Sequence, residues 1–147
     1  MTRHSESRIL PYSPQQMFDL VADVGRYPEF LPWCAAARVR RLDETPYGQV
    51  MEADLVVSFR VFRERFGSRV ELRGEEDKIV TEYIDGPFRY LRSVWEFRPA
   101  DEGCEVAFQV DFEFKNMILQ RAIGLVFNQA MQRIVRAFEA RAKALHG

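Results

Sequence analysis

Residues 106–134 read VAFQVDFEFKNMILQRAIGLVFNQAMQRI, and within this stretch the spacing of the apolar side chains changes. Up to Phe114 every second residue is apolar, which is typical of an antiparallel strand with one wet face. From Met117 to about Leu145 the spacing is helical. The stretch therefore predicts a strand that leads directly into a C-terminal helix on the order of 40 Å long.

The two halves of this predicted helix differ in composition. Charged side chains cover the far side of the second half, whereas the first half, residues 117–131, is apolar nearly all round. A helix that is apolar all round is buried in protein, in a partner or in lipid. The first half is therefore either the most buried part of the helix or an entrance that faces a ligand or a membrane. The expected inner stripe is Leu119, Ala122, Val126, Ala130, Ile134, Phe138 and Leu145.

The N-terminal part of the sequence predicts one strand and two short helical segments. The strand covers about Arg3–Leu10 and stops at Pro11. Ser13 followed by Pro14 and Gln16 is typical of a capped helix start, and we expect Gly25 to end that helix. The aromatic segment 27–33, bracketed by prolines, predicts one more helical turn.

The middle of the sequence predicts six further strands. Turn signals separate most of them, at residues 45–48, 74–77, 85–87 and 101–103, while the joint at 60–63 has none. Only the last helix is long enough to cover the apolar face of such a sheet. We therefore predict a single α+β domain over residues 1–147, in which a curved antiparallel sheet of about seven strands wraps the C-terminal helix.

Composition narrows the possible functions. The net charge is −1, which argues against a dedicated nucleic-acid binder, and we expect no DNA partner. Cys34 and Cys104 have no metal-ligand spacing and predict reduced thiols. The N-terminus lacks the apolar segment of a secretory signal, and no run of about 20 apolar residues could span a membrane. We expect a cytoplasmic protein whose membrane contact, if it has one, is peripheral.

Catalytic motifs are missing from the sequence. The only histidines, His4 and His146, stand near the two termini, which removes the usual general base of a triad and most common metal sites, and no phosphate-binding loop occurs. Asp111 and Glu113 fall on the wet face of their strand. We therefore expect a binding protein that is not an enzyme and has no cofactor or metal. A cyclase or dehydratase would need an inward acid or base, and the strands offer only hydroxyls and Tyr83.

Aromatic side chains point to an apolar ligand. The chain has 12 Phe, which predicts either a Phe-rich core or an aromatic-lined cavity of about 300–1,000 Å³ between the sheet and the last helix. The candidate ligand-binding residues are Phe30, Leu31, Trp33, Leu55, Val57, Phe59, Phe66, Val70, Tyr83, Leu91, Trp95, Phe97, Phe108, Phe112, Phe114, Ile123, Phe127, Met131 and Ile134.

For several polar and loop residues the sequence allows two interpretations. Segment 30–33 is either an entrance lid or a staple that packs the short helix onto the sheet. The inward hydroxyls of Ser68, Thr81 and Ser93 bind either a polar head group or the protein itself. The strands also carry basic side chains, which either pair with acids across the sheet or form an RNA or acidic-lipid face. These basic residues are Arg60, Arg63, Arg65, Arg69, Arg73, Arg92 and Arg98.

Five segments together resemble the coenzyme Q-binding START-domain family. They are YPEFLPWC at 27–34, GPFRYL at 86–91, WEF at 95–97, DFEFK at 111–115 and AFEARA at 137–142. The resemblance covers nearly the whole chain. It implies a helix-grip fold of the START and polyketide-cyclase superfamily. It also implies a non-enzymatic protein that binds ubiquinone and supports respiratory electron transport and coenzyme Q biosynthesis.

The same segments are similar to the RatA family of bacterial ribosome-association toxins. That resemblance implies binding to the large ribosomal subunit, which blocks the joining of the subunits. The motifs do not separate the two families. The aromatic interior and the absence of a basic excess favour the quinone carrier.

Overall fold

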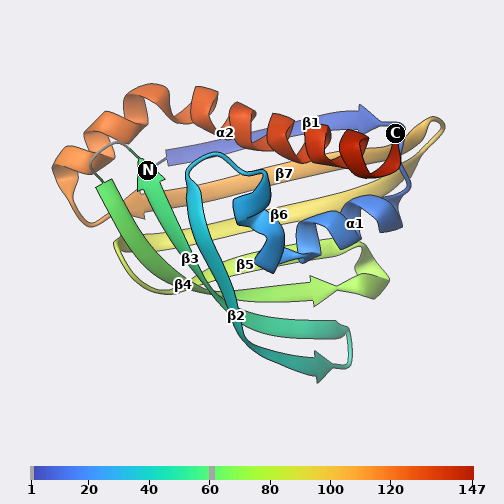
Figure 1. The fold of residues 1–147 in the computed structure, drawn as a ribbon, viewed down its shortest axis with the longest axis horizontal. Coiled ribbons are helices and arrows are strands. Elements are labelled where there is room, and N and C mark those ends of the chain that lie inside the picture. Colours follow the sequence, from blue (N-terminus) through green and yellow to red (C-terminus); the bar gives the residue numbers. More distant parts are fainter. Residues whose placement is uncertain (1, 60–61) are drawn as a thin grey trace.

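The computed structural model describes residues 2–59 and 62–147. Seven strands, two α-helices and two short 3-10 helices make up the fold (Figure 1). In chain order they are β1 (Thr2–Leu10), α1 (Pro14–Ala22), η1 (Val24–Glu29), β2 (Cys34–Thr45), β3 (Gly48–Phe59), β4 (Phe62–Arg73), η2 (Gly74–Glu76), β5 (Lys78–Asp85), β6 (Phe88–Ala100), β7 (Gly103–Phe114) and α2 (Met117–His146).

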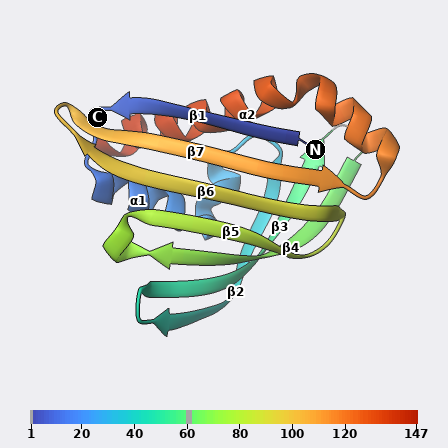
Figure 2. The same cartoon turned by 180° about the vertical axis from the view of Figure 1, so that it is seen from behind.

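The strands form one antiparallel sheet in the order β1-β7-β6-β5-β4-β3-β2. Each strand after β2 pairs with the strand before it, and only β1 joins out of sequence, beside β7. The sheet curves round α2, which lies along β1 and β7, while α1 lies under the same concave side (Figure 1, Figure 2). The predicted fold class, the seven strands and the long C-terminal helix are therefore confirmed.

The N-terminal helices differ in detail from the prediction. Ser13 caps α1 in a capping box with Gln16, as expected. However, α1 ends at Ala22 and not at Gly25, and Gly25 lies inside η1. The second helical segment therefore begins at Val24, earlier than predicted, and residues 30–33 lie beyond it. Asp23, with φ −83° and ψ 64°, takes a non-helical conformation between the two helices, so α1 and η1 are separate elements.

The turns fall where Gly and Pro predicted them. At the β5–β6 turn Gly86 has φ +137°, and an added Cβ would stand 2.7 Å from the Cβ of Phe66. The turn therefore requires glycine at this position. At the joint without a turn signal, Phe59 faces Phe62 across the β3–β4 pair. Arg60, part of the predicted basic face, lies outside the described residues.

The predicted strand faces point inward. On β7, Val106, Phe108, Val110, Phe112 and Phe114 are all buried. The strand register places these residues beside inward residues of β6, for example Phe108 opposite Trp95 and Phe112 opposite Leu91. Period-two alternation is thus sufficient to identify the core face of the sheet.

The expected inner stripe of α2 is confirmed only in part. Phe138 is buried, and Leu119 and Ile134 pack against the core. The buried residues of α2 are Phe127, Val135, Phe138 and Ala142. In contrast, Ala122, Val126 and Leu145 from the expected stripe are exposed. The error arose because the first half of α2 offers apolar residues on every side, so hydrophobic spacing alone could not choose the face that meets the sheet.

Candidate functional site

Aromatic rings fill the space between the sheet and the first half of α2. The Phe88 ring stacks on Phe114 at 4.7 Å between centroids and meets Phe66 and Phe112 edge to face at 5.2 and 5.6 Å. Phe112 in turn contacts Phe127 of α2 at 4.8 Å. These rings come from β4, β6, β7 and α2, so they link the sheet to the helix that covers it.

A second aromatic cluster lies beneath the other half of α2. Phe138 is its centre, with ring centroids 5.0 Å from Trp95, 5.3 Å from Phe30 and 5.4 Å from Tyr27. Tyr27 donates its hydroxyl hydrogen to the carbonyl of Val21. Burial of this ring raises the pKa of Tyr27 far above its ordinary value. This cluster therefore joins α1, η1, β6 and α2 into one packed unit.

The candidate ligand-binding residues divide into two groups. Eight are buried: Phe66, Val70, Trp95, Phe97, Phe108, Phe112, Phe114 and Phe127. The other eleven keep partial exposure: Phe30, Leu31, Trp33, Leu55, Val57, Phe59, Tyr83, Leu91, Ile123, Met131 and Ile134. On β3 the exposure of the inward side chains increases along the strand, because Met51 and Ala53 are buried whereas Leu55 and Val57 are partly exposed. The interior is therefore more open toward the Phe59 end of that strand.

Two recesses lie beside the helices. One, of about 320 Å³, is bounded mainly by α1 and the end of α2, including Leu20, Phe30 and Leu145. The other, of about 420 Å³, lies between residues 30–32 and the α2 residues Arg133, Arg136 and Ala137. Phe30 and Leu31 are the candidate residues that line these recesses, and the candidate strand residues are not among their walls. A role in ligand binding stays a prediction for the whole set.

Residues 27–33 are held against α2 by aromatic and cationic contacts. The guanidinium of Arg133 lies 5.1 Å from the centre of the Trp33 ring, and that of Arg141 lies 5.1 Å from the Phe30 ring. Trp33 has φ +65°, an uncommon conformation for a bulky residue, and its carbonyl accepts a hydrogen bond from the amide of Ser58. The segment therefore packs against α2 through its side chains, and Trp33 extends the contact to β3 through Phe59.

A polar seam, which sequence reasoning missed, joins β1 to α2. Gln120 donates a hydrogen bond to the hydroxyl of Thr2, the Nδ1 of buried His4 lies 3.0 Å from Asn128 Oδ1, and Arg8 pairs with Glu139 at 3.6 Å. The other ring nitrogen of His4 lies 2.8 Å from Glu6. The parity of Thr2, His4 and Arg8 on the predicted first strand could have revealed this polar inward face.

Two inward hydroxyl groups, those of Ser68 and Tyr83, form hydrogen bonds within the protein, and the thiol of Cys104 is buried. Ser68 donates a hydrogen bond to the carbonyl of Ala53 at 3.4 Å, so this hydroxyl binds the protein itself and not a head group. Tyr83 accepts a hydrogen bond from the amide of Phe88. Thr81 and Ser93 face each other across β5 and β6 and are half-buried. Burial raises the pKa of the Cys104 thiol to about 11, which keeps it protonated and unreactive at neutral pH.

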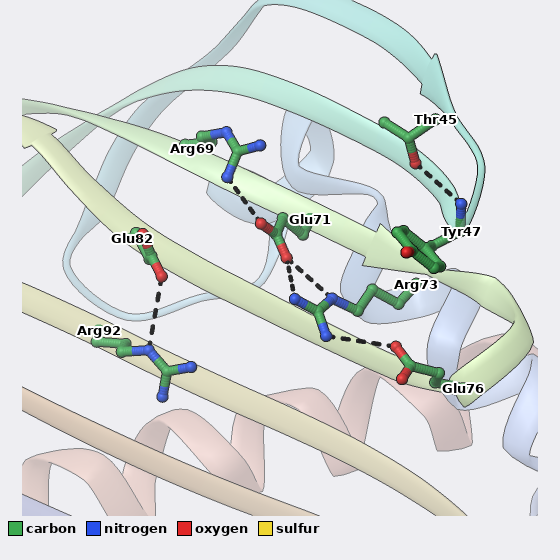
Figure 3. Close-up of polar contacts among 8 residues, drawn as sticks. All are labelled: Thr45, Tyr47, Arg69, Glu71, Arg73, Glu76, Glu82 and Arg92. Carbon is green, nitrogen blue, oxygen red and sulfur yellow. Dashed lines mark hydrogen bonds and ion pairs between the residues drawn. The ribbon is translucent and has the colours of Figure 1, made fainter.

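The outer face of the sheet is covered by paired charges (Figure 3). Glu71 lies between Arg69 and Arg73, at 2.7 and 2.6 Å, and Arg73 also reaches Glu76. Although partial burial opposes the charge of Glu71, hydrogen bonds from Arg73 and Arg69 lower its pKa below the ordinary value. Across the sheet, Asp54 pairs with Arg65 and Glu82 pairs with Arg92, as the prediction of cross-strand pairs requires, whereas Glu96 pairs with Arg98 of its own strand, β6.

Asp111 lies on this outer face, as predicted, and pairs with Arg3. Glu113 lies 3.7 Å from Arg89. Arg63, in contrast, is exposed and has no ion pair within residues 2–59 and 62–147. Most of the basic side chains on the sheet are therefore neutralised by neighbouring acids.

The first half of α2 exposes large apolar side chains. Ile118 is 82% exposed and Leu125 is 87% exposed, and Met117 is also open to solvent. The view that this half is simply the most buried part of the helix is therefore wrong. Phe127, also predicted to face the entrance, is buried and belongs to the core.

The described residues offer neither a metal-binding cluster nor a membrane-spanning helix. No group of three or more His, Cys, Asp and Glu side chains in that part of the chain is placed to hold a metal ion. Among the described helices, none has the length and apolar character needed to cross a bilayer.

The curved sheet that grips a C-terminal helix over an aromatic interior defines the class of START-like, helix-grip proteins. A START superfamily protein from Mycobacterium smegmatis has the same fold, with a TM-score of 0.78 at 17% identity over 97% of this chain and 98% of that one. Residues 10–139 match the family described as polyketide cyclase / dehydrase and lipid transport. The chain belongs to this family, which includes both enzymes and lipid-transport proteins.

Two similar proteins align with nearly the whole of this chain. The ribosome association toxin RatA of Rickettsia prowazekii is 40% identical over 146 residues, which cover 97% of each chain. The mitochondrial coenzyme Q-binding protein COQ10 homolog B of Xenopus laevis is 33% identical over 149 residues, 98% of this chain and 59% of that protein. Both resemblances noted in the sequence are therefore confirmed.

Proposed function

We propose that this chain is a non-enzymatic carrier of a hydrophobic ligand, with ubiquinone as the ligand, at the cytoplasmic face of a membrane. The observation that carries the proposal is the exposure of Ile118 and Leu125 above an aromatic interior. Exposed apolar groups of this size on a soluble domain are typical of sites that meet a partner or a lipid surface. The similarity to a coenzyme Q-binding protein supports the choice of ligand.

Loading would require the first half of α2 to move. The rings of Phe88, Phe112 and Phe114 pack against one another beneath it, so a long apolar ligand needs space that these contacts now occupy. The half-exposed residues Leu55, Val57 and Leu91 lie on the same inward face and would be the next to contact such a ligand. Insertion of Leu125 into a bilayer would place this end of the protein where quinones reside.

The test combines ligand extraction with a matched pair of variants. Freshly purified protein is extracted with organic solvent, the extract is analysed by mass spectrometry, and the protein is then incubated with vesicles that contain ubiquinone. We expect Leu125→Glu to remain folded, to bind vesicles at least about tenfold more weakly, because burial of a leucine contributes about 1.5–3 kcal/mol, and to carry less quinone. Leu42→Glu, at an exposed leucine of β2, should match the wild type.

One result would reject the carrier function: a wild-type protein that contains no quinone after purification and takes up none from vesicles. A folded Leu125→Glu variant that loads quinone normally would reject only the entrance at the first half of α2 and place it elsewhere in the molecule.

A second candidate function, binding to the large ribosomal subunit, is favoured by the 40% identity to a ribosome association toxin. Residues 114–138 also contain four basic and no acidic side chains, which suits contact with RNA phosphates. Co-sedimentation with large subunits that survives moderate salt would support this function. It should then be lost on charge reversal of Arg63, whereas Arg65 and Arg69 are already paired with acids.

A further inference from the structure

The recess between residues 30–32 and α2 combines apolar walls with two unpaired cations. Phe30, Leu31 and Pro32 form one side of this space of about 420 Å³, and Arg133 and Arg136 stand on the other. Neither arginine forms an ion pair with any residue that the structure describes, although most arginines of the sheet do. Both are exposed, one helical turn apart on α2.

The recess is built by specific contacts on both sides. Stacking of Arg133 on Trp33 and of Arg141 on Phe30 holds the segment against α2 at two points. Arg141 also donates to Glu29 at 2.8 Å, so its charge is compensated, while the charges of Arg133 and Arg136 are not. Two free guanidinium groups beside an apolar wall favour an anion that is attached to an apolar body.

Position along the helix indicates where that anion resides. Ile118 and Arg136 are 18 residues apart, which is about five turns of an α-helix, so they lie on the same outward face. Leu125 is seven residues from Ile118, about two turns, and falls close to the same line. One face of α2 thus presents exposed apolar side chains at its start and arginines further along. A membrane surface matches this order, since apolar groups enter the acyl region while arginines meet phosphates.

We propose that Arg133 and Arg136 form a binding site for the phosphate of an anionic phospholipid head group, used when α2 lies on the membrane. The inference rests on the proposed function and adds a lipid preference to it. RNA would also provide phosphates, but it would gain nothing from Ile118 and Leu125 on the same face of the helix. The absence of acidic residues from 114 to 138 removes the repulsion that an anionic surface would otherwise meet.

The experiment measures binding of the full chain to two kinds of vesicle. One contains phosphatidylcholine alone, and the other contains about one third phosphatidylglycerol. We expect Arg133→Gln/Arg136→Gln to bind the anionic vesicles about 25-fold more weakly, since each basic side chain near such a surface contributes about fivefold. Binding to phosphatidylcholine vesicles should not change, because it depends on Ile118 and Leu125.

A matched control removes the same charge elsewhere. Arg38→Gln/Lys78→Gln takes two cations without ion pairs from the sheet, within the described residues, and should retain the preference for phosphatidylglycerol. Trp33 gives a local signal: Trp95 is buried, so a change in fluorescence on vesicle binding should come from Trp33 and vanish in Trp33→Phe. A local signal of this kind would not arise if the arginines only stabilised the fold.

Three outcomes would overturn the proposal. In the first, the arginine variant binds anionic vesicles like the wild type. In the second, the control variant loses as much binding as the arginine variant. In the third, the arginine variant binds vesicles normally but no longer co-sediments with ribosomal subunits, which would assign the site to RNA. Quinone extraction separates the two proposals. A protein that carries quinone yet shows no dependence on Arg133 and Arg136 refutes the head-group site alone.

Discussion

The two halves of α2 contrast in a way that composition does not predict. The first half is the more apolar, yet Ile118 and Leu125 are open to solvent. The second half carries most of the charge, yet Val135, Phe138 and Ala142 are buried against the sheet and α1. Apolar content therefore does not decide burial in this helix. The sheet decides it, because only one face of α2 meets the sheet and the surplus apolar residues of the first half remain outside.

The largest expected effect tests whether the two halves differ in their share of the stability. Phe138→Ala removes a ring that contacts Trp95, Phe30 and Tyr27, and it should lower the free energy of unfolding by about 3–5 kcal/mol. Leu125→Ala removes an exposed side chain and should change it by less than about 0.5 kcal/mol. Urea denaturation of both variants measures the difference. Similar losses in the two variants would show that Leu125 is packed in solution, and the contrast would fail.

The sequence predicted the sheet better than it predicted the site. Alternation identified the inward faces of β3, β4, β6 and β7, because an antiparallel strand with one wet side has a strict period of two, but the polar inward face of β1 was missed. Phe127 and Leu125 were not separated, because a helix that is apolar all round has no preferred phase. The role of the recess cations was also missed. Arg133 is exposed, as expected for the charged side chains of the second half of α2, but its contact with Trp33 joins segments 100 residues apart, which no local pattern reveals.

An intermediate effect concerns the polar seam that fastens α2 to β1. Asn128→Ala would leave Nδ1 of the buried His4 without its partner, which should cost about 1–3 kcal/mol of stability. Because Asn128 lies just after the exposed residues, we also expect faster hydrogen exchange in the first half of α2 than in the second. Denaturation and site-resolved exchange together measure this. Uniformly faster exchange along α2 would mean that the helix responds as one unit.

A matched change elsewhere in the seam sharpens the result. Glu139→Gln weakens the 3.6 Å pair with Arg8, which is partly exposed, so it should cost less than about 1 kcal/mol. It should also leave exchange in the first half of α2 unchanged. If Glu139→Gln has the larger effect, the second half of the helix depends on the seam more than the first.

The smallest effect concerns Gly124, which lies in the first half of α2 between Ile123 and Leu125. A glycine inside a helix has two possible explanations, looseness of the helix or close packing against a bulky neighbour. Apart from its two chain neighbours and the adjacent backbone of the helix, no atom lies within 4 Å of the position that a Cβ would take, so the packing explanation is wrong. Gly124→Ala should therefore stabilise the protein by about 0.5–1 kcal/mol, because alanine loses less backbone entropy in a helix.

If the first half of α2 must shift for quinone to enter, Gly124→Ala should take up quinone from vesicles more slowly while it binds vesicles normally. Extraction of the protein at successive times measures this uptake. Ala140→Gly, at an exposed position of the second half, is the reciprocal control: it should destabilise the protein by a similar amount and leave the rate of uptake unchanged. Equal uptake rates for Gly124→Ala and the wild type would mean that flexibility at this glycine plays no part in loading.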